Sequence, residues 1–345
     1  MLIDDTLIMN GRQRCAAALE NRPVDRVPVF PLLMFLAADR LGVSYREFAT
    51  DGGVMAEAQL KVYERFHVDA ITACSDAFRI AADLGAEMQY PDALPPHSPP
   101  LIIGHSDLAS LTRPDPIRPR SRMADRTRAV KEMVQAAGDE CMIVGWVDLP
   151  FAEACSVCGV QNFLTALVTN PEFAHRVLEF LTPVVIDFCL AQLDEGAPMI
   201  GCGDAAASLI SPAMYREFAL PYEQQVFAAI HEARGKGKLH ICGDTSALLK
   251  DMATSGADLI NVDHLVDFDS ACDAYGRAGR CFKGNLDPVS DVMDRTPEEC
   301  ERLCRELIHR AEGLPYMLSA GCEVPAGTSD ETFHAFCRAP RQARD

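Results

Sequence analysis

The sequence predicts an α/β fold, a (β/α)8 barrel of parallel strands that forms one domain over residues 1–345. Three observations support this fold: apolar strand-like runs recur along the chain, helix signatures separate them, and the length exceeds the ~250 residues typical of such a barrel. The eight runs are residues 27–34, 70–76, 141–148, 198–204, 238–244, 259–264, 281–288 and 316–322. Strands that alternate with helices pair in parallel through right-handed crossovers, and a doubly wound open sheet is the alternative.

Two of the intervening segments contain residues typical of a helix N-terminus. Thr296 precedes Pro297 and two glutamates, so the segment offers an N-cap hydroxyl, a proline at the first helical position and acids in the first turn. Ser211 followed by Pro212 opens another segment in the same way. Both segments follow predicted strands, as a barrel requires.

Composition excludes several classes of protein. With 48% hydrophobic residues the chain can bury a large core, and its net charge of −18 argues against nucleic acid or an anionic membrane as the main partner. That charge permits a protein partner with a basic face, and it leaves a homo-oligomer open. The first residues lack a signal peptide, and no apolar run approaches the ~18 residues of a membrane span. We therefore expect a cytoplasmic protein whose 14 cysteines are reduced thiols, with a redox or metal-binding role as the alternative for the Cys155–Cys158 pair.

Three residues form a candidate metal site: His240, Cys242 and Cys322. His240 and Cys242 are two residues apart on a strand-like run, so their side chains point to the same side. Cys322 ends another such run, and two strand ends can converge on one ion. Zinc takes one imidazole and two thiolates with a fourth position open for water or substrate. The alternative is that the cysteines are small core residues and the histidine is buried and hydrogen-bonded, and spacing alone does not decide between the two.

Other polar residues stand at predicted strand ends, where barrel enzymes keep their catalytic groups. Asp263 would orient His240 or occupy the fourth metal position, and Asp204 and Asp76 would bind substrate or carry a proton. Asn285 and Asp287 would contact a bound cofactor or anion. Helix capping and turn formation explain each of these five residues equally well.

Five segments resemble the uroporphyrinogen decarboxylase superfamily, and together they span nearly the whole chain. They are residues 21–29, 76–90, 210–222, 284–288 and 321–325. The resemblance implies a (β/α)8 barrel. The decarboxylases carry an arginine-rich segment after the first strand to hold the substrate's carboxylates, whereas this chain has the apolar residues 32–39 there.

His240, Cys242 and Cys322 match, residue by residue, the zinc ligands of the corrinoid-dependent methyltransferase branch, typified by methylcobamide:coenzyme M methyltransferase. This resemblance implies a zinc enzyme that moves a methyl group from a methylated corrinoid to a small acceptor, a thiol such as coenzyme M or tetrahydrofolate. The corrinoid would come on a partner protein, because the chain has no Asp-x-His-x-x-Gly cobalamin-binding motif. A decarboxylase of porphyrin biosynthesis is the alternative, and a barrel that only binds a ligand is a third possibility.

Overall fold

The computed structural model describes residues 8–341 and contains one parallel sheet whose seven strands lie side by side in chain order. The strands are β1 (Ala70–Thr72), β2 (Met142–Asp148), β3 (Met199–Gly203), β4 (Lys236–His240), β5 (Leu259–Asn261), β6 (Cys281–Leu286) and β7 (Tyr316–Ala320). Every neighbouring pair is parallel, and the register places Gly203 of β3 beside His240 of β4. The carboxyl ends of all seven strands therefore meet at one end of the sheet.

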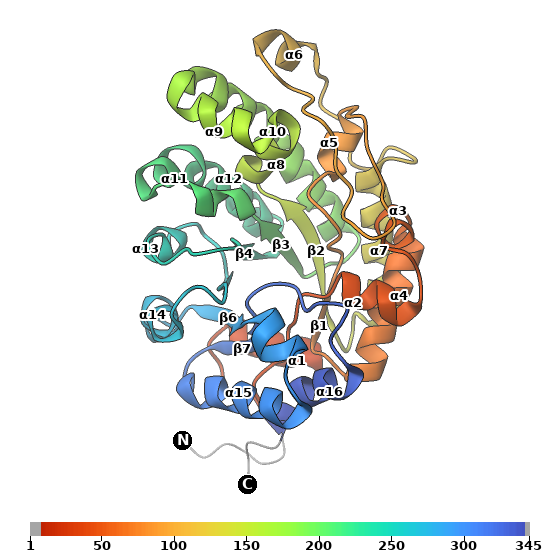
Figure 1. Cartoon of the computed structure of the whole chain (residues 1–345), viewed down its shortest axis with the longest axis vertical. Helices are drawn as coiled ribbons and strands as arrows, with labels where there is room; N and C mark the ends of the chain where they lie inside the picture. The colour runs from red at the N-terminus through yellow and green to blue at the C-terminus, as the bar shows by residue number, and fades with distance from the viewer. Residues whose placement is uncertain (1–7, 342–345) are drawn as a thin grey trace.

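Helices surround this curled sheet, with α4 and α7 on one side of the view and α11 to α14 on the other (Figure 1). The helices are α1 (Gly11–Leu19), α2 (Phe35–Leu41), α3 (Tyr45–Thr50), α4 (Gly52–Phe66), α5 (Arg79–Asp83), α6 (His105–Ser110), α7 (Arg122–Ala137), α8 (Pro150–Cys158), α9 (Val160–Thr169), α10 (Pro171–Asp194), α11 (Pro212–Phe218), α12 (Leu220–Glu232), α13 (Leu249–Met252), α14 (Phe268–Ala274), α15 (Pro297–Arg310) and α16 (Asp330–Arg338). Short 3-10 or π turns are η1 (Ala205–Leu209), η2 (Gly276–Ala278), η3 (Pro288–Met293) and η4 (Ala339–Arg341). The predicted starts at Ser211 and Thr296 are confirmed, since both side chains cap their helices.

The predicted eight-stranded barrel is confirmed only in part, because the first run, residues 27–34, does not form a strand. It makes single parallel bridges from Val29 and Leu32 to β7 and to Glu323 just beyond it, and the Val29 carbonyl accepts from Asp69 next to β1. Pro28 and Pro31 lack the N–H groups that a continuous ladder needs. The architecture is therefore a seven-stranded parallel sheet curled into a half-barrel.

A buried ion-pair cluster holds residues 25–29 beside the start of β1. The carboxylate of Asp69, 2% exposed, accepts from Arg14 at 2.5 Å, from Arg26 at 2.7 Å and from the backbone N–H of Val29 at 2.7 Å. Arg14 also pairs with Asp25 at 2.6 Å. Residues 25–29, which belong to the family-like opening segment, therefore have a structural role.

The inside of the sheet is filled in layers. Near the starts of the strands the layer is apolar and includes Met142, Met199 and Met317. Closer to the carboxyl ends, Trp146 of β2 lies across Gly201 of β3, where a Cβ atom would come within 2.5 Å of the indole ring. Glycine is required there because any side chain would displace the tryptophan.

Among the described residues, no single helix is long and apolar enough to cross a membrane. The bent pair α8 and α9 satisfies the length and hydropathy criteria only when the two helices are joined across their 109° break.

Candidate metal centre

Three side chains from two strand ends converge at the carboxyl end of the sheet. His240 is the last residue of β4, Cys242 follows in the loop, and Cys322 lies just beyond β7. The Sγ atom of Cys242 is 3.0 Å from Nε2 of His240 and 3.5 Å from Sγ of Cys322. The predicted convergence is therefore present, with the three donor atoms within 4.8 Å of one another.

The donor set fits a zinc ion. With Zn–S near ~2.3 Å and Zn–N near ~2.0 Å, tetrahedral geometry separates two thiolate sulfurs by about 3.7 Å and a sulfur from an imidazole nitrogen by about 3.5 Å. The sulfur separation is close to this value, and the nitrogen–sulfur contact requires an outward shift of about half an ångström. Three protein ligands leave one position for another group.

Burial distinguishes the two cysteines of the candidate site from the other twelve. All fourteen thiols are free, and only Cys242 and Cys322 are half-buried while the rest are buried. The core-cysteine alternative therefore describes the others, including Cys155 and Cys158 of α8. Burial raises the pKa of Cys158 to about 12, which opposes thiolate chemistry at that pair.

The two thiols of the candidate site perturb each other. The hydrogen bond between their sulfurs lowers the pKa of Cys322 and raises the pKa of Cys242, with burial adding to the rise at Cys242. His240 is 3% exposed, and its Nδ1 atom has no hydrogen-bond partner among the described residues.

Asp263 lies beside this centre and fastens two loops. Its Oδ2 accepts from the backbone N–H of Gly243 at 3.0 Å, and its Oδ1 accepts from the N–H of Leu265 at 3.0 Å. Because Gly243 follows Cys242 directly, Asp263 fixes the loop that carries this ligand. Asp263 was predicted to orient His240, but Nδ1 of His240 has no hydrogen-bond partner among the described residues. The suggested fourth-ligand role stays a prediction.

Beneath the ligands lies a floor formed by Lys238 and Trp146. Lys238 precedes His240 by two residues and points to the same side of β4; its Nζ is 4.5 Å from the Trp146 ring centroid and has no hydrogen-bond partner among the described residues. Burial lowers its pKa to about 8. The indole N–H of Trp146 donates to Asp148 at the end of β2.

Asp76 and Asp204 are placed elsewhere. Asp76 accepts two hydrogen bonds of 2.8 Å from Arg122, which outweigh burial and hold its pKa well below the usual range. Asp204 is fully buried on the outer side of the sheet against Glu223 of α12. Two carboxyls in contact must share a proton, and burial followed by Glu223 raises the pKa of Asp204. Neither residue has a described contact with the three ligands, so catalysis by them stays a prediction.

Asn285 and Asp287 order the neighbouring loops. The amide of Asn285 donates to the carbonyl of Val266 at 2.6 Å and to that of Asp263 at 3.3 Å. Asp287 caps η3 through the N–H groups of Val289 and Ser290. These contacts match the turn-forming alternative, and a cofactor-binding role stays a prediction.

Sequence reasoning missed Glu323 as a site residue and placed His264 at a predicted strand end without a role. Glu323 follows Cys322 and accepts from the backbone N–H of Phe35 at 2.5 Å, which ties the second ligand loop to α2; burial raises its pKa to about 8. His264 lies between two carboxylates, 3.1 Å from Asp263 and 3.6 Å from Asp287. Their positions next to predicted site residues were the available signal.

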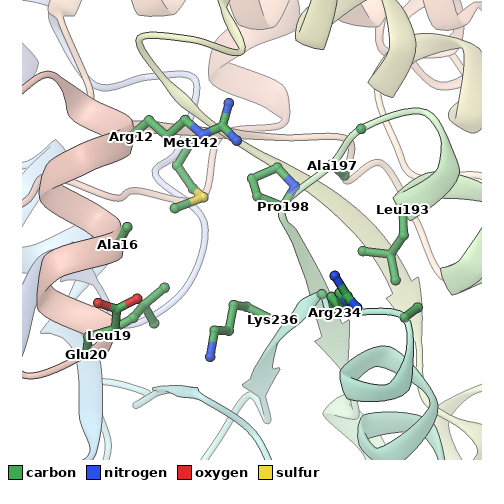
Figure 2. Close-up of a pocket in the computed structure, with 13 residues that line it drawn as sticks. Arg12, Ala16, Leu19, Glu20, Met142, Leu193, Ala197, Pro198, Arg234 and Lys236 are labelled. Atoms are coloured by element: carbon green, nitrogen blue, oxygen red, sulfur yellow. The ribbon is translucent and has the colours of Figure 1, made fainter.

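A separate pocket of about 420 Å³ opens at the opposite end of the sheet, between α1 and the starts of β3 and β4. Figure 2 shows Arg12 and Ala16 of α1, and Glu20 just after its end, facing Lys236 across it. The pocket lies far along the strands from the ligand end, so it is not part of the metal centre.

The comparisons with known proteins identify the family. The family model described as uroporphyrinogen decarboxylase (URO-D) matches residues 10–343. The chain belongs to the uroporphyrinogen decarboxylase family. A methylcobamide:CoM methyltransferase from Methanosarcina mazei is 28% identical over 92% of this chain and 93% of its own, which confirms the resemblance to that branch.

Other relatives define the range of the family. A methylated-thiol–coenzyme M methyltransferase from Methanosarcina mazei is 27% identical over 97% of this chain and 90% of its own. A uroporphyrinogen decarboxylase from Synechococcus is 25% identical over 88% of this chain and 86% of its own. The solved structure of a methyltransferase from Methanosarcina mazei has a TM-score of 0.88 at 21% identity, covering 97% of this chain and 99% of its own. This last match shows a shared fold.

Proposed function

We propose that this protein is a zinc-dependent methyltransferase that takes a methyl group from a methylated corrinoid protein and gives it to a small acceptor. The observation that carries the proposal is the convergence of His240, Cys242 and Cys322 at the carboxyl end of the sheet. The relatives named as methylcobamide:CoM methyltransferases support the same reaction class.

The reaction balances without an external oxidant or reductant. The carbon–cobalt bond breaks with its electron pair left on cobalt, a lone pair of the acceptor sulfur forms the new carbon–sulfur bond, and the thiol proton goes to solvent. A zinc ion held by the three ligands would lower the pKa of an acceptor thiol and so supply the nucleophile at neutral pH.

The chain's own residues do the positioning. Asp263 holds the Cys242 loop through Gly243, and Glu323 holds the Cys322 loop against α2. The buried floor of Lys238 and Trp146 excludes water beneath the ligands. Such fixed surroundings keep ligand geometry within the narrow tolerance that a metal demands.

Elemental analysis of purified protein tests the proposal first, and we expect about one zinc per chain. Cys242→Ala and Cys322→Ala should lose it, whereas Cys158→Ala, which changes a buried cysteine away from the centre, should keep it. Wild-type protein that is purified without metal, yet unfolds cooperatively as a folded protein does, would count against the proposal.

Incubation with methylcobalamin and either coenzyme M or tetrahydrofolate, followed through the cobalamin spectrum, identifies the acceptor. We expect demethylation by wild type and Cys158→Ala and none by the two ligand variants. Release of carbon dioxide from uroporphyrinogen, without demethylation in either mixture, would favour the decarboxylase instead.

A further inference from the structure

Four segments at the carboxyl ends of β3 to β6 form a continuous surface next to the metal centre, here called the acidic rim. They are residues 204–210, 243–246, 263–267 and 285–294, and the last of them begins with the final two residues of β6. The ideal Cβ position of Gly243 lies 3.0 Å from Oγ of Ser208, Asp263 accepts from Gly243, and His264 bridges to Asp287. Each loop therefore touches the next.

Exposed aliphatic side chains stand on this surface. Leu209 is 63% exposed, Leu265 57% and Val289 43%. Exposed aliphatic groups on one continuous surface rimmed by polar residues are typical of a protein contact.

The charge of the rim is of one sign. Its four loops contain no lysine, arginine or glutamate, and five of their seven aspartates reach the surface, because Asp204 and Asp263 are buried. Asp244, Asp267 and Asp294 are exposed, and hydrogen bonds from Ser270 lower the pKa of Asp267.

A groove of about 530 Å³ borders the rim. It runs between the loops and α15 and is lined by His264, Asn285 and Asp291 on the rim side and by Leu303, Glu306 and Arg310 on the helix side. The groove offers a recess for a side chain of a docked protein beside Leu265 and Val289.

We propose that the acidic rim is the docking surface for the corrinoid-carrying protein, whose complementary face is basic with apolar contacts. This inference rests on the proposed function, because the methyl donor must reach ligands that lie at the inner edge of the rim. A second copy of the chain is a poorer occupant, since a symmetric contact would set the surface aspartates of one rim against those of the other. Opposite charges on the partner would instead speed association.

The test uses purified methylated corrinoid proteins that carry the Asp-x-His-x-x-Gly motif, with free methylcobalamin as the parallel donor. Leu209→Glu and Leu265→Glu are compared with Ile8→Glu, an exposed aliphatic residue at the opposite end. We expect the two rim variants to lose at least tenfold in kcat/KM with the corrinoid protein and to match wild type with free methylcobalamin. Ile8→Glu should match wild type with both donors.

Salt provides a second readout, because raising ionic strength should lower kcat/KM with the corrinoid protein and leave it unchanged with free methylcobalamin. Unchanged kcat/KM of the rim variants with the protein donor would overturn the proposal, as would a wild type that prefers free methylcobalamin to every corrinoid protein tried. Dissociation of a homo-oligomer by the rim variants, with transfer intact, would assign the rim to self-association. No transfer by wild type from either donor would reject the proposed function itself.

Discussion

Gly321→Ala tests whether the metal centre depends on close contact between two strand ends. An ideal Cβ at Gly321 would lie 2.3 Å from the backbone nitrogen of His264 and 2.9 Å from the carbonyl carbon of Asp263. Both neighbours are backbone atoms, so neither can rotate away. An ordinary contact of at least 3.4 Å requires the two loops to separate by about 1 Å.

That displacement acts directly on the ligands. Gly321 precedes Cys322, and the opposing loop contains Asp263, which fixes the Cys242 loop. Metal–ligand distances tolerate only about 0.2 Å, so a shift of this size removes or weakens one ligand. We expect zinc affinity to fall by about 10- to 100-fold, and overpacking to destabilise the fold by about 1–3 kcal/mol.

Competition with a chromophoric chelator measures the zinc affinity, and thermal unfolding of the metal-free protein measures stability. Gly104→Ala is the matched control, since no atom lies within 4 Å of its Cβ position and its φ is not positive. Zinc affinity of Gly321→Ala within twofold of wild type, with an unchanged melting temperature, would refute the reasoning.

Three further results are expected. Burial raises the pKa of Glu223 from 4.5 to about 7. The neutral carboxyl therefore contributes stability that is fully present below pH 4.5 and is lost as the pH rises through 7. Glu223→Gln should flatten the fall in melting temperature between pH 5 and 8. Asp263→Asn keeps one acceptor oxygen for two backbone donors and should destabilise the fold by about 1–3 kcal/mol and weaken zinc binding about tenfold in the chelator competition assay. Zinc removal should lower the melting temperature of wild type, because the ion binds the folded state, and leave that of Cys242→Ala unchanged.

Much of the fold was predictable because its elements are encoded locally. Apolar runs bounded by polar residues mark the seven strands, and Ser211 and Thr296 mark their helices through capping. Pro28 and Pro31 explain why residues 27–34 do not form a strand, because neither can donate a backbone hydrogen bond. Whether this matters depends on which N–H groups of the segment face a neighbouring strand. Only the tertiary structure supplies that information.

The metal centre was predictable in its ligands and less so in its surroundings. His240 and Cys242 share a strand face at a spacing of two, whereas the distance from Cys322 is set by the curvature of the sheet. Whether a strand-end aspartate points inward depends on register: Asp263 lies next to the ligand loop, while Asp204 turns outward to Glu223. The alternation of side chains along a strand predicts which face of the sheet a residue points to only when the strand boundary is known within one residue.

X-ray absorption at the zinc edge on the purified protein tests the central claim most directly. One zinc per chain with two sulfur ligands near ~2.3 Å and one imidazole, lost together in Cys322→Ala, is the predicted result. A metal bound without sulfur, or the same two-sulfur spectrum in Cys322→Ala, would contradict it.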